Sequence, residues 1–233
     1  MPLLATAWSP IRSGVSLVRW PASSVAWRAL RTDEGAVFDK EIVIDVSDLS
    51  PMITWGTSPQ HAVPIRASVP QQAASGTTAE AYLRALQYMD LQPGVALESL
   101  KIDAAFIGSC TNSRLSDLRR AANILRGQRV AAGVRAICVP GSMSVKRAAE
   151  AEGLDQVFRD AGFEWRESGC SMCFFAGGES FGEQERVVSS TNRNFESRQG
   201  PQTRTHLASP ETVAASAVAG HLIDFRRLTS EVI

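Results

Sequence analysis

Long apolar runs and an excess of charge are both missing from this sequence. No uninterrupted apolar stretch approaches the roughly 18 residues that a membrane-spanning helix needs, so no membrane segment is expected. Lys and Arg total 24 and Asp and Glu also total 24, which leaves no net charge to attract a nucleic acid or an anionic lipid surface. The composition therefore indicates a globular protein that binds neither nucleic acid nor membrane.

Cysteine is also scarce. Four cysteines in 233 residues are too few for a disulfide framework, so a reducing compartment, the cytoplasm, is favoured. In such a compartment a Cys-x-x-Cys pair, here Cys170 and Cys173, more often binds a metal or performs redox chemistry than forms a structural disulfide. These two residues therefore become the first candidates for a functional site.

Acidic residues are absent from the first 31 positions, which contain several serines and the arginines Arg12, Arg19, Arg28 and Arg31. This composition is typical of an organellar transit peptide, which makes an organellar matrix the alternative location. Three prolines, Pro2, Pro10 and Pro21, would however interrupt a long amphipathic helix. We therefore expect residues 1–25 to be poorly ordered and residues 26–233 to form the folded domain.

Strand and helix patterns alternate from Asp103 onward. The strand candidates are Asp103–Ile107, Arg135–Val139, Gly162–Arg166 and Arg186–Ser190. The helix candidates are Ser113–Arg126, Ser144–Glu152, Leu154–Ala161 and a helix that begins at Ser209-Pro210-Glu211 and runs to about Asp224. Further upstream, Glu41–Val46 is a possible strand and Thr78 to about Met89 a helix. The alternation predicts the α/β class, as a three-layer α/β/α domain whose mainly parallel sheet has helices on both faces.

Each of the four predicted strands is followed by an unusual motif. These motifs are Gly108-Ser109-Cys110, Pro140-Gly141-Ser142, Gly169-Cys170-Ser171-Met172-Cys173 and Asn192-Arg193-Asn194. The carboxyl ends of parallel strands meet at one edge of a sheet, where ligands bind in folds of this class. We therefore expect thiol, amide and guanidinium groups to converge there.

The cysteines allow three chemistries. Three thiolates from two loops, Cys110 with Cys170 and Cys173, could hold a 4Fe–4S cluster and leave one iron open. All four cysteines, with Cys138 included, could make a zinc site, although Cys138 lies within an apolar run typical of a buried, inert thiol. A redox pair formed by the Cys-x-x-Cys residues is the third possibility.

The arginines after the fourth strand have two interpretations. Arg193 and Arg198 could bind carboxylates bidentately, or they could be surface residues in salt bridges. The histidines His61, His206 and His221 show no metal-ligand spacing, so we expect packing or surface roles for them.

Several long motifs in one order resemble the aconitase superfamily, and within it the large subunits of 3-isopropylmalate dehydratases. The motifs are Phe106-Ile107-Gly108-Ser109-Cys110-Thr111-Asn112-Ser113-Arg114, Val139-Pro140-Gly141-Ser142, Gly169-Cys170-Ser171-Met172-Cys173, Ser190-Thr191-Asn192-Arg193-Asn194-Phe195 with Arg198, and Thr203-Arg204-Thr205-His206-Leu207-Ala208-Ser209-Pro210. Weaker similarity reaches back through Trp55-Gly56-Thr57 to about Ala26.

This resemblance implies a function. Cys110, Cys170 and Cys173 match the three ligands of a 4Fe–4S cluster whose fourth iron acts on the substrate as a Lewis acid. Asn192, Arg193 and Arg198 match positions that contact the substrate, a small hydroxy-carboxylic acid. The family reaction dehydrates a hydroxy-acid and rehydrates it at the neighbouring carbon, a step of leucine biosynthesis for 3-isopropylmalate dehydratase. In isopropylmalate dehydratases the serine base lies on a swivelling domain that is a separate small subunit, so the resemblance implies such a partner here.

Two departures from the family pattern keep alternatives open. Family large subunits are about twice as long, and their N-terminal acid–base residues have no counterpart here, so the catalytic residues stay unknown. The chain also shows no swivelling domain of its own. The stretch Phe174–Ser180 is atypical as well, which leaves another malate or citrate analogue as a possible substrate. The alternatives are a truncated, non-catalytic remnant that binds a cluster or zinc, and a thiol oxidoreductase that uses Cys170 and Cys173.

Overall fold

The computed structural model describes residue 25 and residues 27–175 and 179–229. The chain divides into two units, Met1–Asp48 and Leu49–Ile233. Most of the predicted poorly ordered segment, residues 1–25, lies outside the described residues. The predicted folded domain begins at residue 26, whereas the second unit begins at Leu49. Residues 26–48 therefore belong to the first unit.

The described part of the first unit is mostly extended chain. Helical conformation at residues 25 and 27–29 is followed by residues 30–48, which form neither helix nor strand. The predicted strand Glu41–Val46 is therefore wrong. Its side chains Ile42, Val43 and Ile44 are highly exposed, and a strand requires a neighbour to accept its backbone hydrogen bonds.

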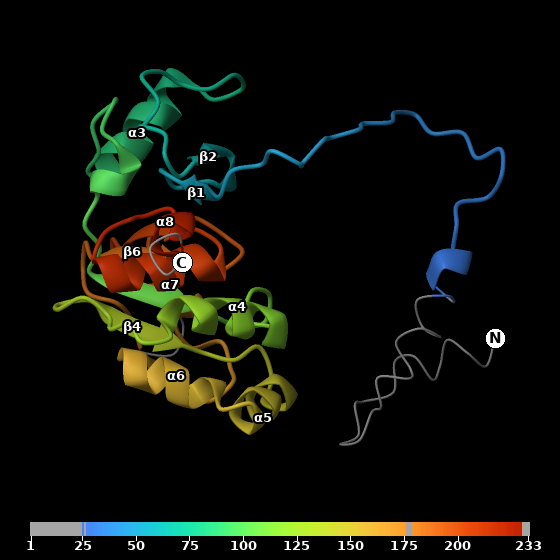
Figure 1. Cartoon of the computed structure of the whole chain (residues 1–233). Coiled ribbons are helices and arrows are strands. Elements are labelled where there is room, and N and C mark those ends of the chain that lie inside the picture. Colours follow the sequence, from blue (N-terminus) through green and yellow to red (C-terminus); the bar gives the residue numbers. More distant parts are fainter. Residues whose placement is uncertain (1–24, 26, 176–178, 230–233) are drawn as a thin grey trace. The chain divides into compact units, whose positions relative to one another are not determined.

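A five-stranded parallel sheet forms the centre of the second unit, and it confirms the predicted α/β class (Figure 1). Its strands are β3 (Ala104–Ile107), β4 (Arg135–Cys138), β5 (Glu164–Trp165), β6 (Arg186–Ser189) and β7 (Arg204–Leu207). They lie in the order β5-β4-β3-β6-β7, and every neighbouring pair is parallel. The fifth strand, β7, was not predicted, although its residues belong to one of the family-like motifs.

The long helices of the sheet region lie on one face of the sheet. They are α4 (Leu115–Leu125), α5 (Met143–Ala151), α6 (Leu154–Ala161) and α7 (Pro210–Ala219). Ala105, Ala136 and Val188 point to this face and share one buried core with residues of these helices. The small side chains of α7 allow it to pack closely against both α4 and β3.

The other face is covered by loops. From β3 through β4 to β5 the chain adds strands toward one edge of the sheet, and β6 and β7 then lie on the other side of β3. Crossovers between parallel strands are right-handed, so this change of direction places the β5–β6 and β6–β7 connections on the opposite face from the earlier ones. There Phe106, Ile137 and Val187 pack against Met172 and Phe181 of the β5–β6 connection. Among the described residues this layer contains only a short 3-10 turn, Ser171–Cys173, instead of the helices expected there.

Helix boundaries follow the capping signals. The Ser209 side chain accepts a hydrogen bond from Thr212 N at the start of α7, as the Ser209-Pro210-Glu211 pattern predicted. This helix ends at Ala219 rather than near Asp224, because Gly220 caps it in a left-handed conformation. A separate helix follows, α8 (Phe225–Thr229).

The smaller elements lie before the sheet in sequence. Helix α3 (Ala79–Met89) begins after Thr78, as predicted. Strands β1 (Met52–Thr54) and β2 (Ala62–Pro64) form an antiparallel pair around the 3-10 turn η1 (Pro59–His61), and a second such turn is η2 (Leu97–Ser99). The β1–β2 pair was not predicted, because three-residue strands show too little periodicity.

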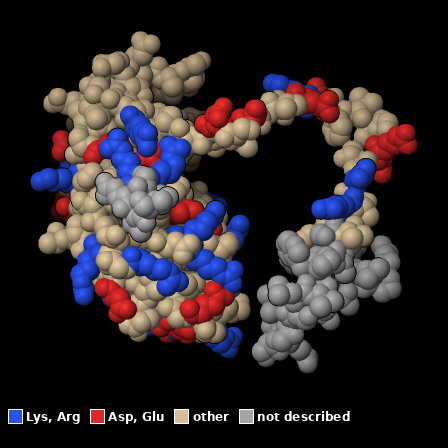
Figure 2. All heavy atoms as spheres, viewed as in Figure 1, with Lys and Arg blue, Asp and Glu red and all other residues tan. Residues whose placement is uncertain are grey.

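On the visible face of the second unit, basic side chains are interspersed with acidic ones (Figure 2). Many basic side chains of the second unit form ion pairs, such as Arg119 with Glu152 at 2.6 Å and Lys146 with Glu150 at 2.7 Å. None of the helices in the described ranges has both the length and the apolar character of a membrane span.

Candidate functional site

The motif-bearing loops emerge at the carboxyl edge of the sheet. Cys110 follows β3, the pair Cys170 and Cys173 follows β5, and Asn192 and Arg193 follow β6. This is the arrangement that the sequence predicted from strand alternation. The structure further shows which side chains hold these loops to each other.

Ser190, at the end of β6, fixes the loop that carries Cys110. Its hydroxyl is fully buried, accepts a hydrogen bond from Gly108 N at 3.0 Å and lies 3.1 Å from Asn112 O. In return, the Asn112 side chain donates to Ser190 O at 2.8 Å. A buried polar side chain with several partners rigidifies its surroundings, so the start of the Asn192 loop and the Cys110 loop are held as one piece.

Two glycines allow this loop to pack tightly. A Cβ atom at Gly108 would lie 2.8 Å from the Phe106 ring, and one at Gly141 would lie 2.9 Å from Ser113 O. Gly141 N also donates to Ser113 O at 2.9 Å. The loop after β4 therefore supports the Cys110 loop through direct backbone contact.

Arg198 and Gln199 join the Cys-x-x-Cys turn to the loop after β6. The Arg198 guanidinium donates to Cys173 O at 2.7 Å and to Cys173 Sγ at 3.2 Å. The Gln199 side chain donates to Met172 O at 2.8 Å. Cys173 N in turn donates to Cys170 O at 2.8 Å, which closes the turn between the two cysteines. Loops from three strand ends are thus connected by hydrogen bonds through Ser190, Arg198 and Gln199.

The cysteine thiols are the right kind of ligand for a metal cluster, but the structure does not bring three of them together at one point. All four are free thiols, with Cys110 and Cys170 exposed and Cys173 half-buried. Within residues 25, 27–175 and 179–229, no group of three or more His, Cys, Asp or Glu side chains is placed to hold a metal ion. The structure therefore places the predicted ligands on interconnected loops without gathering the three sulfur atoms at one point.

The predicted substrate contacts fall into two groups. Asn192 and Arg193 are exposed, whereas Arg198 is buried with its guanidinium directed at the cysteine turn. Between them, the Asn194 side chain is buried and donates to Thr54 Oγ1 at 3.1 Å and to Gly56 O at 2.6 Å. The Trp55-Gly56-Thr57 motif therefore helps to fix the loop that presents Asn192 and Arg193.

The fourth cysteine lies away from the site chemistry. Cys138 is fully buried at the end of β4, on the helix-covered face, and burial raises the pKa of its thiol well above the usual range. A buried, protonated thiol is a poor metal ligand. This placement agrees with the interpretation of Cys138 as a packing residue.

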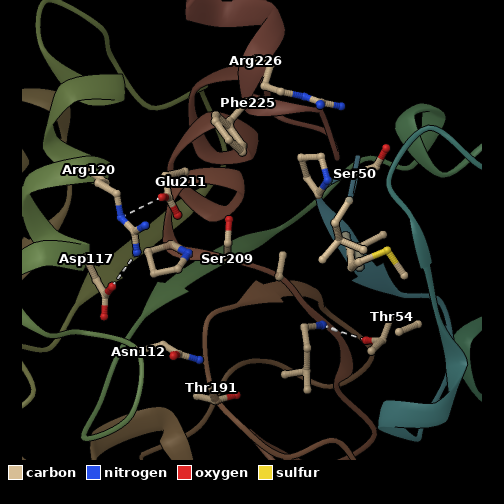
Figure 3. Close-up of a pocket in the computed structure, with 18 residues that line it drawn as sticks. Ser50, Thr54, Asn112, Asp117, Arg120, Thr191, Ser209, Glu211, Phe225 and Arg226 are labelled. Carbon is tan, nitrogen blue, oxygen red and sulfur yellow. Dashed lines mark hydrogen bonds and ion pairs between the residues drawn. The ribbon is translucent and has the colours of Figure 1, made fainter. Parts of the chain in front are cut away.

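A separate cavity of about 780 Å³ opens nearby and is lined by Asn112 and Thr191 (Figure 3). Its Arg120 side chain lies between Asp117 and Glu211, at 2.9 Å and 3.0 Å, so its charge is already neutralised. Among the described lining residues there is none of the predicted cysteine ligands or substrate-binding residues. We therefore assign the candidate chemistry to the loop edge and not to this cavity.

The sequence analysis did not identify three residues that support the site, which are Ser190, Asn194 and Gln199. Their roles depend on partners about 80, 140 and 27 positions away in the chain, which no local pattern reports. The only available signal was their position in or beside the family-like motif around Asn192 and Arg193.

Comparison with known proteins gives consistent results. The family model described as "Aconitase family (aconitate hydratase)" matches residues 12–220, and so extends into the segment expected to be unmatched. The chain is 65% identical over 211 residues to the 3-isopropylmalate dehydratase large subunit of Cupriavidus necator, covering 90% of this chain and 79% of the relative. It is 54% identical over 211 residues to the 3-isopropylmalate dehydratase large subunit 1 of Bradyrhizobium diazoefficiens, again covering 90% of this chain but only 44% of that relative.

Proposed function

Because this chain belongs to the aconitase family, we propose that it is the cluster-binding part of an iron–sulfur hydro-lyase of the 3-isopropylmalate dehydratase large-subunit type. The reaction would be the dehydration and rehydration of a hydroxy di- or tricarboxylic acid. The observation that carries this proposal is the hydrogen-bonded connection, at one sheet edge, of the three loops bearing Cys110, Cys170 with Cys173, and Asn192 with Arg193.

In this proposal Cys110, Cys170 and Cys173 hold a 4Fe–4S cluster. Three free thiols on mutually fixed loops are the right donor set for a cluster with one iron lacking a protein ligand. When bound, such a cluster supplies a Lewis acid for the substrate hydroxyl and carboxylate. The contact from Arg198 to Cys173 Sγ supports the proposal, because a charged donor stabilises an anionic sulfur.

Asn192 and Arg193 would bind the substrate. Both are exposed at the edge where the cysteine loops emerge, and a guanidinium recognises a carboxylate with two parallel hydrogen bonds. Among the described acidic residues none lies within ion-pair distance of Arg193, whereas Arg204 pairs with Asp90 at 3.2 Å. Arg193 is therefore the better placed of the two cations to meet a substrate carboxylate.

A second protein chain belongs to the proposed enzyme. The 233-residue chain spans less than half of the Bradyrhizobium relative, whose name as a large subunit implies a small-subunit partner for that protein. We propose such a partner here too, and with it a role in leucine biosynthesis. Proton transfer often supplies factors of about 10² to 10⁴, so the chain without its partner is expected to be a poor catalyst.

Anaerobic reconstitution with iron and sulfide tests the proposal. The chain is expected to take up about four irons, and mild oxidation is expected to give the EPR signal of a three-iron cluster. Cys110→Ala should lose the cluster. If the chain binds zinc and takes up no iron, or shows thiol–disulfide activity that survives Cys110→Ala, the hydro-lyase proposal fails.

Activity is tested separately, with 3-isopropylmalate and with citrate and malate analogues. The reconstituted chain is assayed alone and together with a small subunit of a 3-isopropylmalate dehydratase. Activity that appears only with the small subunit supports the two-chain enzyme. A stable cluster with no activity under either condition would instead identify a non-catalytic cluster-binding protein.

A further inference from the structure

Helix α3 is fixed to strands β6 and β7 through its last turn. Arg186 of β6 donates to Met89 O at 2.9 Å, and Arg204 of β7 donates to Tyr88 O at 3.3 Å. Arg204 also pairs with Asp90, the C-cap residue of the helix, at 3.2 Å. Positive side chains near a helix C-terminus interact favourably with the helix dipole. The last turn of α3 is therefore held against both strands.

The Tyr88 hydroxyl extends from this turn to the segment 197–203, which lies between β6 and β7 in the chain. It donates a hydrogen bond to Thr203 O at 2.9 Å and accepts one from Ser197 N at 2.6 Å. A phenol hydroxyl can donate and accept at the same time. One oxygen atom therefore joins the two ends of the segment.

The start of this segment has a backbone conformation that needs such support. Ser197 has a φ angle of 61°, in the left-handed region that a residue with a Cβ atom adopts only at a cost. Its side chain accepts a hydrogen bond from Gln202 N at 3.0 Å, and Thr203 Oγ1 donates to Gly200 O at 3.0 Å. A strained conformation persists only where surrounding contacts fix it, and Tyr88 supplies one of these contacts.

The segment carries Arg198 and Gln199, whose side chains bond to the Cys-x-x-Cys turn. Their carbonyl groups accept hydrogen bonds from the β5–β6 connection as well. Arg198 O accepts from Phe175 N at 2.7 Å, and Gln199 O accepts from Phe181 N at 2.9 Å. The segment is thus bonded to α3 on one side and to the chain around the cysteine turn on the other.

A second link between α3 and this loop is weaker. Arg84 donates to both carboxylate oxygens of Glu196, each at 3.0 Å. However, the Arg84 side chain is 73% exposed, and exposed ion pairs contribute little to stability and are screened by salt. The half-buried Tyr88 is therefore the contact that decides where the segment lies.

From these contacts we infer that Tyr88 is a positioning residue, whose hydroxyl acts through the segment 197–203 to hold Arg198 and the cysteine turn in place. Arg198 belongs to the predicted substrate contacts together with Arg193, and Cys173 is a predicted cluster ligand. A residue of α3, outside every motif that suggested the function, thus sets the geometry of both. The inference deepens the proposed function, and its part on substrate binding rests on that proposal.

Tyr88→Phe is the variant that tests this role, because it removes one oxygen atom and keeps the ring. Ser197 N and Thr203 O then lose their shared partner. The matched control is Tyr82→Phe on the same helix, where the lost hydroxyl donates to Pro70 O at 2.7 Å instead. Both variants lose a phenol hydroxyl from α3, but only the first loses a bond to the segment.

The first experiment measures hydrogen exchange of single amides in the metal-free full chain. The Phe175 and Phe181 amides report on the segment, because they bond to its carbonyl groups and not to Tyr88. Both should exchange several-fold faster in Tyr88→Phe and at the unsubstituted rate in Tyr82→Phe. If faster exchange in Tyr88→Phe is confined to Ser197, whose amide loses its acceptor directly, the inference is wrong.

A measurement on the unsubstituted chain replaces this comparison if Tyr88→Phe fails to fold, which circular dichroism would show. Exchange of the Ser197, Phe175 and Phe181 amides is followed in low concentrations of urea. If the Tyr88 contact and the segment open as one unit, the three amides should share one opening free energy and one urea dependence. Opening of Ser197 without Phe175 and Phe181 would overturn the inference.

The second experiment uses the chain after anaerobic reconstitution, assayed with the small subunit. Tyr88→Phe should keep its iron and raise KM by about 3- to 10-fold with a smaller change in kcat, because a less firmly held Arg198 weakens substrate binding. Tyr82→Phe should match the unsubstituted chain in both constants. Equal KM values in the two variants would contradict a positioning role. If the unsubstituted chain takes up no iron or shows no activity, the proposed function fails, while the exchange experiment still tests Tyr88.

Discussion

Arg186 Nη1 lies 2.9 Å from His206 Nε2, inside the second unit where β6 and β7 run side by side. The other ring nitrogen, Nδ1, lies 2.7 Å from Thr54 O, so His206 is neutral, with the proton on Nδ1 and Nε2 as the acceptor. Burial, together with the charge of Arg186, lowers the pKa of His206 to about 3. Burial also lowers the pKa of Arg186 to about 10, which still leaves the guanidinium charged at neutral pH.

This pair predicts a loss of stability in mild acid. The unfolded chain binds a proton at His206 near pH 6.5 while the folded chain resists it down to about pH 3, so stability falls as the pH drops through this window. Burial lowers the pKa of His61 as well, which adds a contribution of the same sign. We expect a loss of about 1–2 kcal/mol between pH 6.5 and pH 5, measured by urea unfolding of the metal-free chain.

The matched variant for this measurement is His206→Gln, which removes the titrating ring and keeps a polar side chain. It should be less stable at pH 7, because a flexible amide side chain does not reproduce the ring's fixed contacts with both Arg186 and Thr54, and its stability should depend less on pH between 6.5 and 5. An unaltered pH dependence in His206→Gln would show that other groups cause the acid sensitivity.

A second prediction concerns Gly141, where β4 continues into the loop that supports the Cys110 loop. The Cβ atom of Gly141→Ala would lie 2.9 Å from Ser113 O and 3.0 Å from Ser109 O, and both of these are backbone atoms that cannot rotate away. We expect a loss of about 1–3 kcal/mol in unfolding free energy, as for other overpacked sites. Gly169→Ala is the control, because nothing lies within 4 Å of the new methyl group there. Equal stabilities of the two variants would contradict the close contact.

A third prediction separates the cluster from an all-thiolate zinc site. Cys138 is fully buried, so Cys138→Ala should leave the iron content after reconstitution unchanged, in contrast to Cys110→Ala. Alkylation of the native, metal-free chain followed by mass spectrometry should modify the other three cysteines well before Cys138, since the thiolate is the reactive form. Loss of metal in Cys138→Ala would favour the four-cysteine zinc alternative.

The sequence predicted the parallel sheet because its central strands are buried on both sides and read as apolar runs, such as Ala104–Ile107. Strand β7 escaped prediction because Arg204 and His206 interrupt its apolar pattern, and His206 is buried only because Arg186 and Thr54 satisfy its ring. The segment Glu41–Val46 has the composition of a strand, but composition does not provide a neighbouring strand. Tertiary contacts decided both cases.

The candidate site, too, was predictable from the sequence only in part. Its position at the carboxyl edge follows from strand alternation, and the cysteine spacing follows from the sequence directly. The sequence does not predict the different surroundings of Arg193 and Arg198, because both are arginines in one short loop. Only the contacts of Arg198 with the Cys173 turn distinguish the two. The covering of the second sheet face by loops also depends on strand order, which the sequence pattern leaves open.

The order of the strands has a consequence for the sequence of folding events. Ala104 of β3 pairs with Arg135 of β4, which is near in the chain, and with Val187 of β6, which is far away. Closing the shorter loop costs less entropy, so β3, α4 and β4 should form first, and β6 should add afterwards. Pulsed hydrogen-exchange labelling during refolding should protect Ile137 before Val188, and simultaneous protection would argue against this order. The β5–β6 and β6–β7 connections, which carry Cys173 and Arg198, would then take their final positions only after β3, α4 and β4 have formed.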